Sequence, residues 1–224
     1  MSITTRGREI SRLEALSDGV FAFAATLLVV SLEVPDTFAD LVRDLSGFGA
    51  FAISFAALML IWVAHNGFFR RYGLSDGTTV FLNLTLLLVV LFYVYPLKFV
   101  TRGIVQIVFG VDTGSSLSIT PGELGQLFAL YGAGFIAIFV CFALMYRHAH
   151  RVRERLGLTA GESHEAAMWW RHYLIMALVG VVSVVMALTG IGVGIGAPGW
   201  IYAVIGPLAW WHGAWSERRA PSPL

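Results

Sequence analysis

A small set of polar side chains lies inside apolar stretches of this sequence, where groups that carry charge or hold protons are energetically costly. The set comprises Ser17, Asp18, Trp62, His65, Asn66 and Asn83. Ionisable groups in such surroundings tend to mark ion or proton pathways, although polar side chains also join membrane helices through hydrogen bonds. Two interpretations therefore compete. Asp18 and His65 form a proton relay or ion site, or the whole set fastens helices together.

Six apolar stretches are long enough to hold these groups within a membrane, since a span needs about 20 residues. They run over about 13–34, 47–69, 79–100, 123–146, 170–191 and 198–215. Residues 109–123 are expected to form a loop, with Pro121 near a helix start. The Gly/Pro-rich segment 190–199 is expected to join the last two spans tightly. The expected fold class is therefore all-α, a polytopic membrane protein with one six-span domain over residues 1–224.

The polar side chains of the first three spans share one depth. Asp18 lies six residues beyond Arg12, and His65 lies five residues before Arg70, so both are about 7–9 Å into their helices. Asn83 is again five residues into the third span. We expect a buried Asp18 carboxylate with donors from the neighbouring helices, because a buried charge needs hydrogen-bond partners.

The cationic residues predict the orientation, since cytoplasmic loops are enriched in Lys and Arg. Three of the 15, Arg43, Lys98 and Arg102, fall on one side. The other twelve fall on the opposite side, and they are Arg6, Arg8, Arg12, Arg70, Arg71, Arg147, Arg151, Arg153, Arg155, Arg171, Arg218 and Arg219. Both termini are thus expected in the cytoplasm, with residues 147–165 as a basic connector.

The composition excludes several classes of protein. Apolar residues make up 57% of the 224, charged residues only 13%, and the mean hydropathy is +0.75, which leaves no surface for a large soluble domain. The single cysteine, Cys141, excludes a disulfide within the chain and a cysteine-built metal site. No cofactor, resident metal or nucleic-acid partner is expected.

One stripe of the first helix is apolar along its length. At about 100° per residue, the stripe contains Gly19, Phe23, Thr26, Leu27, Val30 and Val34. Ser17 and Asp18 are expected to point away from it. The stripe can therefore face a partner or an axis while the polar pair faces the second and third helices. By itself, such a stripe is most often a packing surface.

The start of the first span carries a motif that resembles a known family signature. Arg12-x-x-x-Leu16-Ser17-Asp18-Gly19 resembles the signature R-x-x-x-F-S-D-[GA] of the lysosomal and endosomal potassium channels and their bacterial homologues, the transmembrane protein 175 family. The spacing of Trp62 and His65 in the second span, and of Asn83 and Pro96 in the third, is similar to that family as well. The same letters at Ser75-Asp76-Gly77 are explained by a helix-capping turn.

The resemblance implies a potassium-permeable cation channel in the bacterial inner membrane, built as a homotetramer because the chain holds one six-span unit. It implies a pore lined by the first helix, with Phe23, Leu27 and Val30 as a hydrophobic constriction and Thr26 associated with selectivity. Arg12, Ser17, Asp18, Trp62, His65, Asn66 and Asn83 then form a structural polar network. Leu16 replaces the motif's Phe, and Phe23 replaces the usual Ile or Leu of the constriction.

Three other functions stay open from the residues alone. A proton-coupled secondary transporter could use Asp18 and His65, although the spans show no convincing inverted repeat. A membrane enzyme could use His148, His150, His164 and His172 as metal ligands, but their spacing fits no metal motif. A structural or regulatory membrane subunit is the third. The residues and the resemblance together favour a channel that is not an enzyme.

Overall fold

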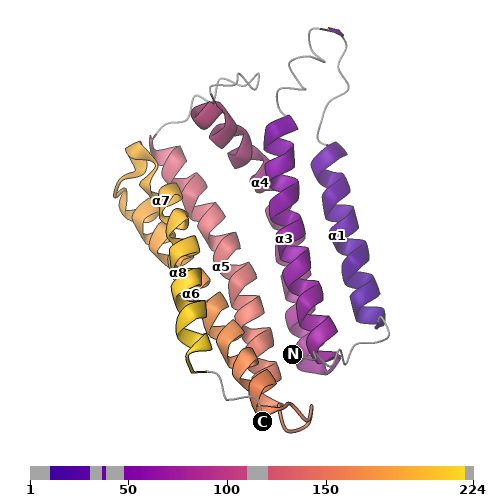
Figure 1. Cartoon of the computed structure of the whole chain (residues 1–224). Helices are drawn as coiled ribbons and strands as arrows, with labels where there is room; N and C mark the ends of the chain where they lie inside the picture. Colours follow the sequence, from indigo (N-terminus) through magenta and orange to yellow (C-terminus); the bar gives the residue numbers. More distant parts are fainter. Residues whose placement is uncertain (1–10, 31–36, 39–47, 110–120, 220–224) are drawn as a thin grey trace.

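The computed structural model describes residues 11–30, 37–38, 48–109 and 121–219, and this part of the chain is helical, with no strand. The long helices are α1 (Arg12–Val30), α3 (Phe48–Tyr72), α4 (Gly77–Phe109), α5 (Pro121–Arg151), α6 (Ala160–Thr189) and α8 (Ile205–Glu217). They lie side by side as a bundle (Figure 1). Three short elements precede α8, namely η1 (Val193–Ile195), α7 (Ala197–Trp200) and η2 (Ile201–Val204). The predicted all-α class is confirmed.

Four helical segments among the described residues are long and apolar enough to cross a membrane. They are Phe51–Tyr72, Gly77–Val94, Gly122–Arg151 and Ala160–Thr189. Several spans in one chain confirm a multi-pass membrane protein. The first predicted stretch, 13–34, is described only as far as Val30, and residues 31–34 lie outside the described part.

Helices α5 and α6 run further into the basic connector than their apolar stretches predict. Helix α5 continues to Arg151, and α6 begins at Ala160 rather than near residue 170. A capping box explains the early start, because Thr159 accepts from the Glu162 backbone N–H while Glu162 accepts from the Thr159 backbone N–H. The basic connector predicted over 147–165 is therefore helical at both ends, and residues 152–159 link the two helices.

The stretch 198–215 is not one uninterrupted α-helix. Helix α7 has four residues, the 3-10 helix η2 has four, and α8 has thirteen. Pro207 explains the break, because it has no N–H to donate and its ring clashes with the carbonyl four residues earlier. The tight connection over 190–199 is confirmed, with Gly190, Gly192 and Gly196 at φ values of 76°, 67° and 70°.

The most extensive helix contact joins α5 and α6 and depends on close approach. A Cβ atom on Gly132 would lie 2.3 Å from Val184 Cγ2, and one on Gly180 would lie 2.8 Å from Ile136 Cγ1. Small residues allow this packing where the bilayer provides no hydrophobic force between helices. Toward the end of α5 and the start of α6, the interface continues as stacked aromatic rings, including Phe142 with Tyr173 at 5.1 Å.

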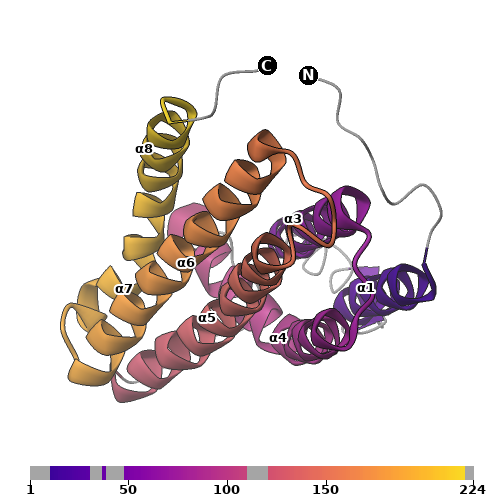
Figure 2. The ribbon, with the colours of Figure 1, turned by 90° about the horizontal axis from the view of Figure 1, so that it is seen from below.

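Helix α1 lies at one edge of the chain and packs against α3 and α4. Figure 2 shows α1 and α8 at opposite edges, with α5 and α6 between them. The two edges therefore present different helices to whatever surrounds the chain.

Candidate functional site

The candidate site begins where α1 starts, at a reciprocal cap. The Ser11 backbone N–H donates to Glu14 Oε2 at 2.7 Å, and the Glu14 N–H donates to Ser11 Oγ at 3.2 Å. This capping box fixes the first turn of α1 and so the direction of the residues that follow. The spacing Ser11-x-x-Glu14 is the signal in the sequence that indicates such a cap, and the apolar pattern of the span does not reveal it.

A chain of side-chain hydrogen bonds joins the first part of α1, the last part of α3 and the first part of α4. Asn83 Nδ2 donates to Ser17 Oγ at 2.9 Å, and the Ser17 hydroxyl donates to the Leu13 carbonyl at 2.8 Å. Asn83 Oδ1 lies 2.6 Å from His65 Nε2. The side chains of Ser17, His65 and Asn83 are at most 1% exposed. The predicted grouping of these three residues at one depth is therefore observed.

The direction of these bonds defines the tautomer of His65. Because the Asn83 amide nitrogen donates to Ser17, its carbonyl oxygen is left to accept, and His65 Nε2 must carry the proton. The ring is enclosed by Phe21 at 5.4 Å and Phe69 at 4.7 Å between centroids. A proton passed along this chain would reach an amide, which does not titrate, so the arrangement suits a helix fastener better than a relay.

Asp18 lies differently from our expectation. Its side chain is exposed in the single chain, and its described hydrogen bond comes from Trp62 Nε1 at 2.8 Å. The expectation of a buried carboxylate with several donors was wrong for the chain alone. One residue along α1 is a rotation of about 100°, which carries Asp18 from the buried side of Ser17 to the flank of the helix.

The two remaining members of the predicted network stand apart from this layer. Arg12 is exposed at the start of α1, and Asn66 is half-buried one residue after His65. No hydrogen bond described in the structure joins either of them to Ser17, His65 or Asn83.

The predicted apolar stripe of α1 is uncovered in the single chain. Phe23 is 57% exposed and Leu27 is 39% exposed. Thr26 is also exposed, and its hydroxyl donates to the Phe23 carbonyl at 2.7 Å within the same helix. The side chain of Val30 and the whole of Val34 lie outside the described part.

The opposite face of α1 is closed against the chain. Phe21, Ala24 and Leu28 are at most 1% exposed and belong to the main core. Helix α1 thus has a buried face, which continues from Ser17, and an exposed apolar face, which continues from Gly19. A large exposed apolar surface on one side of a fixed helix marks an interaction surface or a face toward lipid.

A second polar cluster surrounds Asp76, which lies in the turn between α3 and α4, outside the candidate membrane-spanning segments. The carboxylate caps α4 through the Thr79 backbone N–H at 3.0 Å. It also binds His148 Nε2 at 2.8 Å and Arg155 Nη2. Partial burial raises the pKa of Asp76, but the hydrogen bonds from Thr79, Arg155 and His148 outweigh it and hold this pKa well below its usual range.

The cap of Asp76 was predicted from the sequence, whereas its contacts with α5 and the α5–α6 link were not. A nearby ion pair, between Arg71 and Glu165 at 2.5 Å, also joins the end of α3 to α6. Both pairings connect residues far apart in the sequence, so no local pattern indicates them. Together they tie the α1–α3–α4 side of the chain to the α5–α6 side.

The histidines that we considered as metal ligands have separate partners. His148 binds Asp76, His150 lies near Ser163, and His164 lies 3.1 Å from both the backbone and side-chain oxygens of Ser216. In the described segments, no three His, Cys, Asp or Glu side chains come together as a metal site would require.

Comparison with known proteins agrees with the motif at α1. The family model described as endosomal/lysosomal potassium channel TMEM175 matches residues 12–93, which contain the polar layer. A protein of Marivirga tractuosa named potassium channel is 39% identical over 189 residues, which are 82% of this chain and 76% of that protein. Another potassium channel, from Chamaesiphon minutus, is 27% identical over 74% of this chain and 77% of its own length.

Solved structures show the same fold. A crystal structure of a threonine-to-alanine variant of the potassium channel MtTMEM175, bound to a nanobody fusion, has a TM-score of 0.86 and 34% identity over 97% of each chain. A crystal structure of a lysosomal potassium-selective channel TMEM175 homologue from Chamaesiphon minutus has a TM-score of 0.59 and 25% identity, over 92% of this chain and 96% of that chain.

These similarities define a class of multi-pass, all-helical membrane proteins, and the bacterial relatives imply the inner membrane. Within that class, the chain belongs to the TMEM175 family. The relatives are named as channels, not as enzymes.

Proposed function

We propose that the chain is a potassium-permeable cation channel that assembles as a homotetramer around a pore lined by α1. The observation that carries this proposal is the exposed apolar face of α1, because α1 is fixed to α3 and α4 by its other face. Its relatives are named potassium channels, which supports a conducting role for the same fold. Since this face is exposed in a single chain, other copies must supply the remaining walls of the pore.

The proposed membrane arrangement has six spans within one domain over residues 1–224 and both termini in the cytoplasm. Helix α1 is the first span, and α7, η2 and α8 together form the sixth. The distribution of Arg and Lys supports this orientation, because twelve of the 15 then lie on the cytoplasmic side.

The proposed constriction consists of Phe23, Leu27 and Val30 from each of four copies. Both Phe23 and Leu27 lie on the exposed side of α1, which supports their facing the axis. Such rings gate by dilation and wetting. Thr26 lies on the same side and contributes to selectivity in this proposal, since its hydroxyl oxygen can offer a lone pair to a cation while the proton is bound to the Phe23 carbonyl.

The polar network holds α1 in register, so that the constriction is built at a fixed height and rotation. In this proposal Ser17, His65 and Asn83 anchor the buried face, and Asp18 with Trp62 fixes the flank. Arg12 and Asn66 complete the network through contacts that form in the assembly. Asp18→Asn should therefore lower tetramer formation or open probability, seen by native mass spectrometry and by single-channel recording.

Ion flux into proteoliposomes tests the proposal directly. Potassium that leaves vesicles through the purified protein should draw protons in through an added protonophore, and a pH-sensitive dye reports this uptake. A sodium gradient should drive less proton uptake. Phe23→Ala should increase the flux or reduce the preference for potassium. The matched control is Phe81→Ala on α4, which removes an equally bulky side chain that is 68% exposed and outside the proposed pore.

Two results would contradict the proposal. One is a tetrameric Phe23→Ala variant that conducts like the wild type. The other is saturable flux with a fixed proton stoichiometry that is abolished in Asp18→Asn or His65→Gln, which would support a transporter instead.

A further inference from the structure

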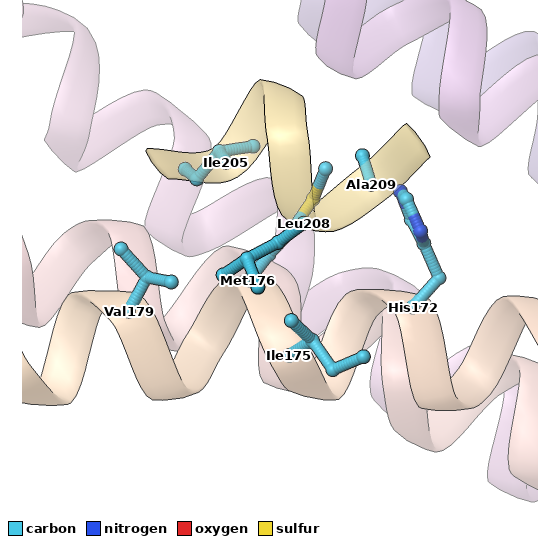
Figure 3. Close-up of a pocket in the computed structure, with 7 residues that line it drawn as sticks. All are labelled: His172, Ile175, Met176, Val179, Ile205, Leu208 and Ala209. Carbon is cyan, nitrogen blue, oxygen red and sulfur yellow. The ribbon is translucent and has the colours of Figure 1, made fainter. Parts of the chain in front are cut away.

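Helix α6 has an exposed face that is apolar along its length and ends in an arginine. Leu174, Leu178 and Leu188 are 39%, 55% and 72% exposed, and Arg171, one turn before Leu174, is exposed as well. Their spacing places these side chains on one side of the helix. Met176 lies on a different side, toward α8 (Figure 3). The arginine therefore continues the outward face of α6 and not its contact with α8.

The exposed face of α5 ends in the same way. Leu130 and Leu144 are 45% and 38% exposed, and Arg147 and Arg151 follow Leu144 three and seven residues later, again exposed. These positions share one side of the helix. Tyr146, next to Arg147 in the sequence, is instead buried. Two candidate membrane-spanning helices thus carry arginines at the end of an exposed apolar face.

The arginines of the two helices lie at nearly the same height. Helices α5 and α6 run antiparallel, and Tyr146 lies beside Trp169 with 6.1 Å between ring centroids. Arg147 is one residue beyond Tyr146 on α5, and Arg171 is two residues beyond Trp169 on α6. At the rise of an α-helix, their backbones differ in height by about 5 Å. Arg147 and Arg171 therefore belong to one band across the two helices.

Exposed tryptophans place this band at the boundary between lipid and water. His212 of α8 lies 5.7 Å from His172, the residue after Arg171. Its neighbours Trp210 and Trp211 are 76% and 58% exposed. Exposed tryptophans at the end of a membrane helix are typical of the interface. The guanidinium groups at this height are therefore within reach of lipid headgroups.

The described carboxylates near the end of α5 and the start of α6 already have partners within the chain. Asp76 and Glu165 pair with other cations, Glu162 caps α6, and Glu154 lies 3.8 Å from Arg153. Within the described part of the chain, none of the three band arginines forms an ion pair. A second copy would thus offer them no unpaired carboxylate from this region, whereas bilayer phosphates supply the complementary charge.

We propose that the arginine band, formed by Arg147, Arg151 and Arg171, binds the headgroups of anionic phospholipids. Their acyl chains then lie along the exposed apolar faces of α5 and α6. Arginines next to a membrane helix attract anionic lipids, and long cationic side chains extend from a helix end to the headgroups. In the proposed orientation these are lipids of the cytoplasmic leaflet. The surface is separate from α1, and the proposal does not depend on conduction.

Native mass spectrometry of the full chain, titrated with phosphatidylglycerol or phosphatidylcholine, tests the proposal. The wild type should bind phosphatidylglycerol more tightly, and Arg147→Gln and Arg171→Gln should each reduce this preference about fivefold. Arg171→Lys should keep it, because the charge remains. The control is Arg153→Gln, whose arginine lies in the α5–α6 link beside Glu154 and should change the preference little. Equal binding of the two lipids, or an equal loss in Arg153→Gln, would overturn the proposal.

Photo-crosslinking of the wild type locates the lipid without any substitution. In vesicles of phosphatidylcholine, a phosphatidylglycerol probe with a photoreactive group near its headgroup should label residues 144–151 and 170–174 more than a phosphatidylcholine probe does. Soluble glycerophosphoglycerol at millimolar concentration should not compete, because it lacks the acyl chains. Equal labelling of these residues by the two probes, or loss of labelling with the soluble headgroup, would show that the arginine band is not a surface for anionic lipid.

Discussion

Different interactions hold the helices together on the α1–α3–α4 side of the chain and on the α5–α6 side. Helix α1 is attached to α3 and α4 through side-chain hydrogen bonds among Ser17, His65 and Asn83 and through the Asp18–Trp62 bond. Helices α5 and α6 are attached by close packing at Gly132 and Gly180 and by stacked aromatic rings.

The contrast indicates which side is fixed and which can be adjusted. Interlocked backbones and rings have one arrangement, and any added atom disturbs it. A few directional hydrogen bonds define a rotation and a height for α1 while leaving its other face free. In the proposed channel, α5 and α6 form a scaffold, and the polar layer positions α1 at the axis.

The largest expected effect comes from adding bulk on the scaffold side. Gly132→Val should prevent stable folding or lower the free energy of unfolding by about 3 kcal/mol, because the new atoms meet Val184. Gly122→Val in the same helix should be far milder, since nothing lies within 4 Å of its Cβ position. Thermal unfolding monitored by size-exclusion chromatography measures both. Equal tolerance of the two variants would show that the α5–α6 contact is looser than described.

A smaller effect is expected from removing the central residue of the polar layer. Asn83→Ala removes the acceptor of His65 Nε2 and the donor to Ser17 Oγ, which keeps only its bond to the Leu13 carbonyl. The expected loss of stability is about 1–3 kcal/mol. The control, Thr85→Ala in the same helix, removes a hydroxyl that bonds only within α4 at 2.9 Å. Chemical denaturation in detergent compares the variants. A stable Asn83→Ala protein would mean that the layer does not fasten α1.

Trp62→Phe should affect stability less and conduction more. An aromatic ring is kept, but Asp18 loses its donor, so about 1 kcal/mol or less of stability is lost. The rotation of α1 should become less defined, which single-channel recording would report as altered open probability. If tetrameric Trp62→Phe channels gate like the wild type, the Asp18–Trp62 bond does not position α1 for conduction.

The smallest effect is expected at Asp76, which links the two sides of the chain, and it appears as a dependence of stability on pH. The pKa of Asp76 is held below its ordinary value of 3.8, so its contribution to stability is present above that value and is lost as the pH falls further. Asp76→Asn keeps the helix cap but should abolish this acid-dependent loss, measured as the difference in melting temperature between pH 6 and pH 3. Glu154→Gln, at a side chain 91% exposed, should keep the wild-type dependence.

Local patterns predicted much of this molecule. Apolar length predicted the long helices, and shared depth predicted that Ser17, His65 and Asn83 would meet, because both follow from the rise per residue along a helix. The cap at Asp76 was also visible from its neighbours in the sequence.

Other features depend on tertiary contacts or on backbone details. The sequence does not show that His148 and Arg155 reach Asp76, since they are more than 70 residues away. Asp18 was misplaced because a single residue of helical phase separates a buried side chain from an exposed one. The break before α8 could have been predicted from Pro207, and the start of α6 from Thr159 and Glu162, but apolarity alone indicates neither.

The central claim, that the exposed face of α1 lines the pore, is tested most directly by cysteine accessibility. The background is Cys141→Ala, which removes the chain's single thiol. Phe23→Cys then places one cysteine on α1. Leu88→Cys instead places it on the exposed face of α4, where Leu88 is 68% exposed. A cationic thiol reagent should block potassium flux in Phe23→Cys and leave Leu88→Cys unaffected. Block at Leu88→Cys with no effect at Phe23→Cys would contradict the claim and move the pore away from α1.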